Sequence, residues 1–135
     1  ISSFEDVATD AVKLISLGNA DVPAGQYARE IFEHLGIWED IQGKISFAGN
    51  VKEVVTHVSE MAADCGVVYA TDATAAGLDW VDAAGEGWHT PVVYPAAVMK
   101  TSRDEEAARA FIEYLKSDEV KAYLESMGFG IPGGN

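Results

Sequence analysis

Three short apolar segments alternate with helical patterns in the first part of the chain, and this alternation constrains the fold more than any other feature. The predicted strands are Leu14–Gly18, Ile45–Ala48 and Gly66–Ala70, and the last is apolar throughout, as a parallel strand covered on both faces would be. Helical spacing of apolar residues predicts helices from about Pro23 to Leu35 and from Val51 to Ala62. Strands that alternate with helices predict an α/β fold, with a mainly parallel sheet flanked by helices.

A glycine-containing loop, Gly85–Pro91, is the best candidate for a boundary within the chain. The segment before this loop, Leu78–Val81, is predicted as a fourth strand at the edge of the sheet. The expected parts are therefore residues 1–90, which hold the predicted sheet, and residues 91–135.

The second part begins with an apolar and extended segment, Val92–Met99. Pro95 within it cannot donate a ladder hydrogen bond, which implies an edge strand, a bulge or a crossing segment. Two amphipathic helices are predicted after this segment, beginning near Ser102 and near Ser117. Their apolar stripes need a covering surface, because each large side chain left exposed would cost roughly 1.5–3 kcal/mol.

The charge of the chain limits its partners. The sequence has 22 acidic residues against 9 basic ones, and its formal net charge is −13. This balance argues against nucleic acid or an anionic membrane as a partner. An anionic ligand stays compatible with it, because backbone dipoles hold anions locally and surface charge is screened within about 8 Å at physiological salt.

Signals of compartment are few. The single cysteine, Cys65, excludes an internal disulfide. The sequence shows no signal peptide, and no apolar run approaches the roughly 20 residues that span a bilayer. Because the first residue is Ile1 rather than methionine, we expect a processed or truncated chain. Whether such a chain has lost a leader peptide or a membrane anchor is left open.

The stretch Val22–Ala28, with the sequence VPAGQYA, follows the first predicted strand and opens the first predicted helix. Pro23 suits a first helical turn because its missing N–H would have no helical partner there. Gly25 is expected to leave this turn bare, so that a ligand could approach the backbone. Such a helix end has free N–H groups and partial positive charge, which predicts a site for a small oxyanion.

Ala24 is one of three places where a predicted strand ends and a helix or turn begins with exposed donors. The others are Val51, which follows the N-cap residue Asn50, and the turn from Tyr69 to Asp72, where the phenol of Tyr69 adds a neutral donor. Ligands of open parallel sheets bind beyond the carboxyl ends of the strands, so all three places could face one crevice. The same pattern is also typical of ordinary capped helix starts, and a tyrosine at a strand end is also typical of a core aromatic.

Motifs for catalysis or metal binding are absent from the sequence. No nucleophile–base pair is recognisable, and neither a phosphate-binding glycine loop nor a nucleophile elbow occurs. His34, His57 and His89 lack the spacing of metal ligands. The sequence therefore predicts a binding protein rather than an enzyme, with no cofactor and no direct metal ligands.

The stretch VPAGQYA at Val22–Ala28 matches a family motif, VPAGxYA. Further matching stretches follow in order at Leu35–Trp38, Gly66–Ala73, Tyr94–Val98 and Gly128–Phe129. On these residues the chain resembles the periplasmic molybdate-binding proteins of ABC transporters, and the resemblance covers essentially all of the sequence.

That resemblance implies a type II periplasmic-binding fold, in which two α/β lobes enclose an oxyanion. The chain resembles the second lobe plus the C-terminal helices. Residues 1–90 would be the oxyanion-binding lobe, and residues 91–135 would be a crossing strand and two helices that pack on the first lobe in the family. No stretch matches the two serine-bearing loops of the family's first lobe. The family's remaining donors map onto the backbone N–H groups of Ala24 and Val51 and the hydroxyl of Tyr69.

The function that the resemblance implies is capture of molybdate or tungstate outside the cytoplasm and delivery to the permease of an ABC importer. The location would be periplasmic, or at the cell surface as a lipoprotein. Two alternatives stay open: an anion-sensing effector domain of a transcription regulator, and binding of sulfate or phosphate. We expect weak binding by this chain alone. We also expect its C-terminal helices to fold back on the lobe or to pair with a second copy through residues 104–128, as a homodimer or domain swap.

Overall fold

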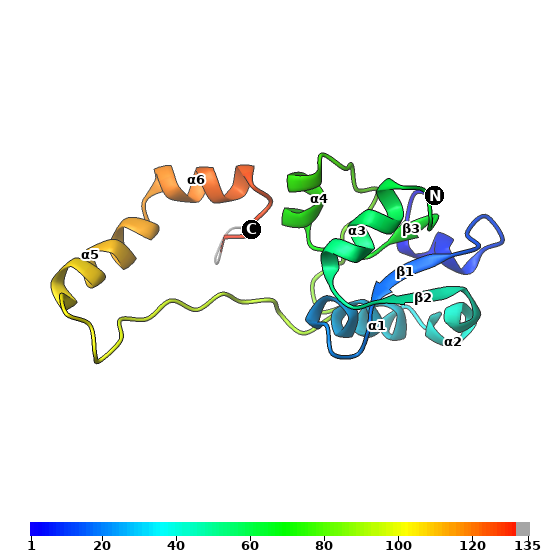
Figure 1. The fold of residues 1–135 in the computed structure, drawn as a ribbon, viewed down its shortest axis with the longest axis horizontal. Helices are drawn as coiled ribbons and strands as arrows, with labels where there is room; N and C mark the ends of the chain where they lie inside the picture. Colours follow the sequence, from blue (N-terminus) through cyan, green and yellow to red (C-terminus); the bar gives the residue numbers. More distant parts are fainter. Residues whose placement is uncertain (132–135) are drawn as a thin grey trace. The chain divides into compact units, whose positions relative to one another are not determined.

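The computed structural model describes residues 1–131 and divides the chain into two compact units, Ile1–Pro91 and Val92–Asn135. The first unit contains, in chain order, η1 (Phe4–Ala8), β1 (Ile15–Gly18), α1 (Pro23–His34), α2 (Trp38–Ile41), η2 (Gln42–Lys44), β2 (Ile45–Ala48), α3 (Val51–Ser59), β3 (Cys65–Gly66) and α4 (Ala70–Ala76). The second unit contains α5 (Glu105–Leu115) and α6 (Asp118–Ser126). Figure 1 labels these elements. The roles assigned above to residues 1–90 and 91–135 stay predictions.

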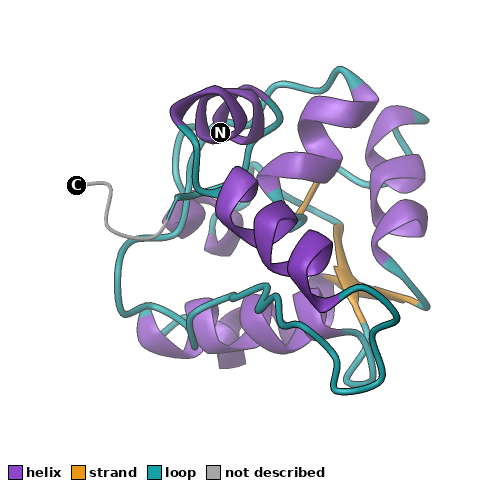
Figure 2. Ribbon diagram, turned by 90° about the vertical axis from the view of Figure 1, so that its left-hand side faces the viewer, coloured by secondary structure: helices purple, strands orange, loops and turns teal. Residues whose placement is uncertain are grey.

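The three strands form one parallel sheet in the order β2-β1-β3. Residues of β1 pair with β2 from Ile15↔Ile45 to Gly18↔Ala48, and β3 pairs with the first half of β1. Within this unit, α1 and α2 lie on one side of the sheet and α3 and α4 on the other (Figure 1). Figure 2 colours the strands orange and shows how short they are beside the helices. The predicted α/β fold, a parallel sheet flanked by helices, is confirmed.

The larger part of the core lies between β1 and α1. Ile15, Leu17 and Phe32 are each at most 1% exposed, and Phe32 belongs to the apolar stripe of α1. Because side chains alternate along a strand, Ser16 points to the opposite face, toward α3. Its hydroxyl is fully buried and lies 2.8 Å from Nδ1 of His57, so this buried polar group has a partner.

Two strand predictions were wrong at the β3 edge of the sheet. The expected strand Gly66–Ala70 is reduced to Cys65–Gly66, because α4 already begins at Ala70 with Tyr69 as its N-cap residue. The expected edge strand Leu78–Val81 does not form. Leu78 instead donates its N–H to the carbonyl of Ala73 at the end of α4, which turns the chain away from the sheet.

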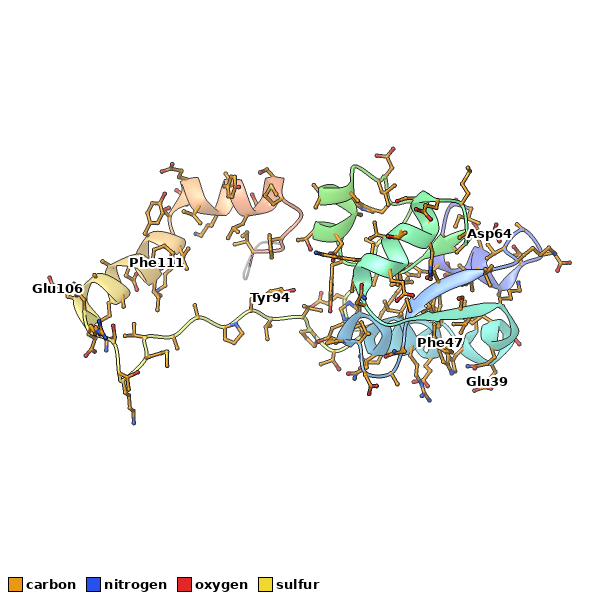
Figure 3. The ribbon with its side chains drawn as sticks, viewed as in Figure 1. Glu39, Phe47, Asp64, Tyr94, Glu106 and Phe111 are labelled. Carbon is orange, nitrogen blue, oxygen red and sulfur yellow. The ribbon has the colours of Figure 1, made fainter. Side chains whose placement is uncertain are left out.

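Two charged side chains join the start of the chain to the sheet through backbone groups. Lys44 Nζ donates to the carbonyl oxygens of Val7, Ala8 and Thr9 at 3.1, 3.2 and 2.6 Å. The carboxylate of Asp64 accepts from the N–H groups of Lys13 at 2.7 Å and of Leu14 at 2.9 Å (Figure 3). The hydrogen bonds from Leu14 and Lys13 hold the pKa of Asp64 below its ordinary value.

Asp64→Asn is expected to lower the free energy of unfolding at pH 7, and the difference from the parent should shrink as the pH falls toward 2. The reason is that a carboxylate with a lowered folded-state pKa stabilises the fold above its unfolded-state pKa of about 3.9 and loses that effect as pH falls through the folded-state pKa. Urea unfolding at several pH values measures the difference in unfolding free energy between the variant and the parent. Asp10→Asn is the control, since the ion pair of Asp10 with Lys13 is exposed. If the loss of unfolding free energy in Asp64→Asn did not change with pH, the lowered pKa of Asp64 would be contradicted.

In the second unit, the two predicted helices are confirmed, while 92–99 has no strand pairing. None of the residues of α5 and α6 is buried, and Phe111 and Tyr123 are 60% and 64% exposed. Tyr94 packs edge-on against Phe129 at 5.9 Å between ring centroids. Figure 3 labels Tyr94 and Phe111. The surface that covers these apolar side chains, and the pairing through residues 104–128, stay predictions.

Candidate anion-binding site

Three helices of the first unit begin at the same edge of the sheet. Because β1, β2 and β3 are parallel, their carboxyl ends meet at one edge, and each strand is followed by α1, α3 or α4. The N–H of Asn19 donates to the carbonyl of Ala48 at 2.9 Å, which continues the β1–β2 ladder into both turns. The predicted residues Ala24, Val51 and Tyr69 therefore all lie at this edge, and their role in binding stays a prediction.

The first turn of α1 leaves one N–H without an acceptor. The carbonyl of Val22 accepts from Gly25 at 2.8 Å and from Gln26 at 3.1 Å, and Pro23 has no N–H. For the N–H of Ala24, no acceptor occurs among residues 1–131. The first turn of α1 also carries no acidic residue, and Asp21 precedes its N-cap residue Val22.

Gly25 has a different role from the one predicted. It is buried, and a Cβ placed there would lie 2.1 Å from the carbonyl oxygen of Gly18 and 2.5 Å from that of Asn19. Glycine is thus required for the close approach of α1 to the end of β1. The expectation that Gly25 bares the turn for a ligand was wrong, because the backbone of this chain already occupies the space beside it.

The start of α3 is capped as the sequence indicates. Oδ1 of Asn50 accepts from the N–H of Glu53 at 3.0 Å, while Oε2 of Glu53 accepts from the N–H of Gly49 at 2.7 Å. The part of the chain that the structure describes contains no acceptor for the N–H of Val51. This turn offers a free donor beside a carboxylate that is already engaged by the backbone.

Tyr69 stands at the start of α4 as its N-cap residue and is half-buried. Its ring packs edge-on against the ring of Tyr27, with centroids 6.4 Å apart. Tyr27 belongs to the second turn of α1, one turn after Ala24. An aromatic contact thus links α4 to α1 close to both helix starts.

Sequence reasoning missed the segment Trp88–His89–Thr90, which packs on α1. Trp88 stacks on His34 with ring centroids 5.8 Å apart, and Tyr27 lies 5.4 Å from His89. The N–H of Thr90 donates to Oε2 of Glu30 at 2.5 Å. A glycine-rich loop gives no periodic signal that could have predicted these contacts.

The two donors without an acceptor among the described residues of this edge, the backbone N–H groups of Ala24 and Val51, are neutral. Within residues 1–131, no group of three or more His, Cys, Asp or Glu side chains is placed to hold a metal ion. The described helices include none with the length and apolar character needed to cross a membrane.

Comparisons with known proteins agree with the fold and with the motifs. A lipoprotein of Bacillus subtilis (strain 168), named as the substrate-binding lipoprotein YvgL of an ABC transporter, is 36% identical over 131 residues, which are 96% of this chain and 50% of that protein. The molybdate-binding protein ModA of Haemophilus influenzae is 35% identical over 117 residues, or 85% of this chain and 46% of that protein. The chain thus spans about half the length of the curated relatives it matches.

A solved structure is similar over nearly the whole chain. The substrate-binding domain assigned to a molybdenum ABC transporter from Clostridium difficile superposes with a TM-score of 0.88 at 37% identity, over 95% of this chain and 57% of that one. The resemblance to molybdate-binding proteins is confirmed by these matches. Residues 1–130 match the family of bacterial extracellular solute-binding proteins, and the chain belongs to that family.

Proposed function

We propose that this chain is part of the extracytoplasmic solute-binding component of an ABC importer, and that it binds molybdate or tungstate for delivery to a membrane permease. The observation that carries the proposal is the meeting of three helix starts at one sheet edge, where the N–H groups of Ala24 and Val51 have no acceptor among the described residues. The names of the similar proteins from Haemophilus influenzae and Clostridium difficile support the choice of ligand.

The proposed donors are the N–H groups of Ala24 and Val51 and the hydroxyl of Tyr69, all of them neutral. Neutral donors suit a fully ionised tetrahedral dianion, which needs hydrogen bonds on every side and brings no proton. Phosphate is partly protonated at neutral pH and would bring a donor to a site built of donors. Sulfate is smaller, so fixed donors spaced for molybdate would fit it less well.

Such a site is compatible with a net charge of −13. Helix ends act over short distances, and α1 adds no acidic residue in its first turn. Three donors nevertheless satisfy only part of the shell of a tetrahedral anion. We propose that further donors come from protein outside this chain, corresponding to the half of the relatives that it does not match. Weak binding by the chain alone is the expected consequence.

Calorimetry with molybdate, tungstate, sulfate and phosphate tests the ligand, both on this chain and on a longer protein that includes the unmatched half. Amide NMR spectra of Ala24 and Val51 during the same titrations test the site. We expect molybdate and tungstate to bind and to shift both amides. Tight binding of sulfate or phosphate without a response to molybdate would overturn the ligand assignment.

Tyr69→Phe is expected to weaken molybdate binding by about 10- to 150-fold, as the loss of one hydrogen bond to a charged group of about 1.5–3 kcal/mol predicts. The fold should survive, because the ring that packs on Tyr27 is kept. Tyr114→Phe, at an exposed tyrosine of α5, is the matched control and should bind as the parent does. Unchanged affinity of Tyr69→Phe would remove Tyr69 from the proposed site.

A further inference from the structure

We propose that Tyr27 is a positioning residue for Tyr69, and that the segment Trp88–Thr90, here called the strap, holds Tyr27 in place. The inference rests on the proposed function, because it concerns the donor that Tyr69 supplies to the anion. It assigns a role to the tyrosine of the VPAGQYA stretch and to a loop that carries no motif of its own.

The strap is seated on one face of α1. Tyr27, Glu30 and His34 follow each other at i, i+3 and i+7, so their side chains line one stripe of the helix. Each contacts a different residue of the strap: Tyr27 meets the ring of His89, Glu30 accepts from the N–H of Thr90, and His34 stacks on Trp88. Three consecutive residues therefore match three positions of one stripe.

Other contacts hold the strap at its first residue. The ring of Trp88 packs edge-on against Phe4 with centroids 5.9 Å apart, and the backbone N–H of Trp88 donates to the carbonyl of Gly85 at 3.2 Å. Nδ1 of His89 lies 2.8 Å from the carbonyl oxygen of Thr90, which can only accept, so Nδ1 carries the proton and the orientation of the ring is restricted. The ring that meets Tyr27 is thus itself restrained.

Tyr27 is the point where the strap and the proposed site meet. Its ring contacts His89 at 5.4 Å on the strap and Tyr69 at 6.4 Å on the start of α4. The edge-on contact, with 66° between the ring planes, limits the positions open to the ring of Tyr69. A donor held in its bound position before the anion arrives loses less conformational entropy on binding, which raises the affinity.

The first test follows the ring of Tyr69 in the full chain without any anion. Tyr27→Leu removes the ring contact and should increase the motion of the Tyr69 ring in NMR relaxation, whereas Tyr27→Phe keeps the contact and should not. Glu30→Gln weakens the hold on the strap and should have an intermediate effect. An unchanged Tyr69 ring in a folded Tyr27→Leu variant would overturn the inference, whatever the protein binds.

The second test measures molybdate affinity in a double-mutant cycle on the longer protein. Tyr27→Leu should weaken binding by about 2- to 10-fold, the range expected for one aromatic pair, and Tyr27→Phe by less. In the Tyr69→Phe background the effect of Tyr27→Leu should vanish, because positioning acts only through the lost hydroxyl. An equal effect in both backgrounds would show a merely structural role and overturn the inference. Absence of molybdate binding by the parent, with the Tyr69 ring still responding to Tyr27→Leu, would instead refute the proposed function and leave the positioning role supported.

Discussion

Gly25→Ala is expected to destabilise the protein by at least about 3 kcal/mol, beyond the usual range for overpacking, and to lower Tm by roughly 10 °C or more. The new Cβ would lie 2.1 Å from the carbonyl oxygen of Gly18 and 2.5 Å from that of Asn19. Both obstacles are backbone atoms of the β1–α1 turn, so no side chain can rotate to make room. The helix would have to move away from the end of β1, and thermal unfolding followed by circular dichroism measures the result.

Gly43→Ala is the matched control for this substitution. A Cβ at Gly43 would meet nothing within 4 Å, so its stability should stay within about 1 kcal/mol of the parent. Should Gly25→Ala unfold at the same temperature as Gly43→Ala, the close approach between α1 and β1 would be refuted. In that case the turn would have room for a ligand beside Gly25, as the sequence had suggested.

Phe32→Ala is expected to cost about 3–5 kcal/mol of unfolding free energy, the range for removing a buried aromatic ring from a core. Phe32 is 0% exposed and is the largest fully buried side chain among the described residues. Its ring also meets Phe4 edge-on at 6.0 Å, and Phe4 in turn packs on Trp88 of the strap. Removing the ring should therefore loosen η1 and the strap together with the core.

Chemical denaturation measures the stability of this variant, and the fluorescence of Trp88 follows the strap when Trp38 and Trp80 are replaced by phenylalanine in both the variant and the parent. Phe47→Ala on β2 provides the control, since the same side chain is 56% exposed there and should cost far less (Figure 3). Equal losses for the two variants would show that Phe32 does not lie in a packed core.

The local sequence pattern was enough to place most helices and the turns at the starts of α1 and α3. The apolar stripe of α1, Pro23 in its first turn and Asn50 as the cap of α3 each depend on residues within one or two helical turns. Such short-range preferences can be read without a structure. The alternation of apolar segments with helices was sufficient for the parallel sheet, because parallel strands require a crossover between them.

The sequence pattern failed where the same residues suited two different local structures equally well. Val67, Val68 and Tyr69 suit a strand, yet the chain leaves the sheet after Gly66 and caps a helix with Tyr69. The contact between His57 and buried Ser16 spans 41 positions of sequence, and the local pattern alone did not predict it. The spacing Val54, His57, Val58 does put His57 on the inner face of α3, a signal that could have predicted the sheet as its neighbour.

The sequence by itself determined that Ala24, Val51 and Tyr69 lie at or just beyond the ends of three parallel strands, and so that they share an edge, since period and capping are local properties. Only the tertiary structure decided that the backbone of Gly18 fills the space beside Gly25, and that the strap packs on α1 beside Tyr27. These contacts join residues between 7 and 62 positions apart, from Gly18 to Gly25 and from Tyr27 to His89. Their geometry depends on how whole elements pack, and no periodicity along the chain encodes it.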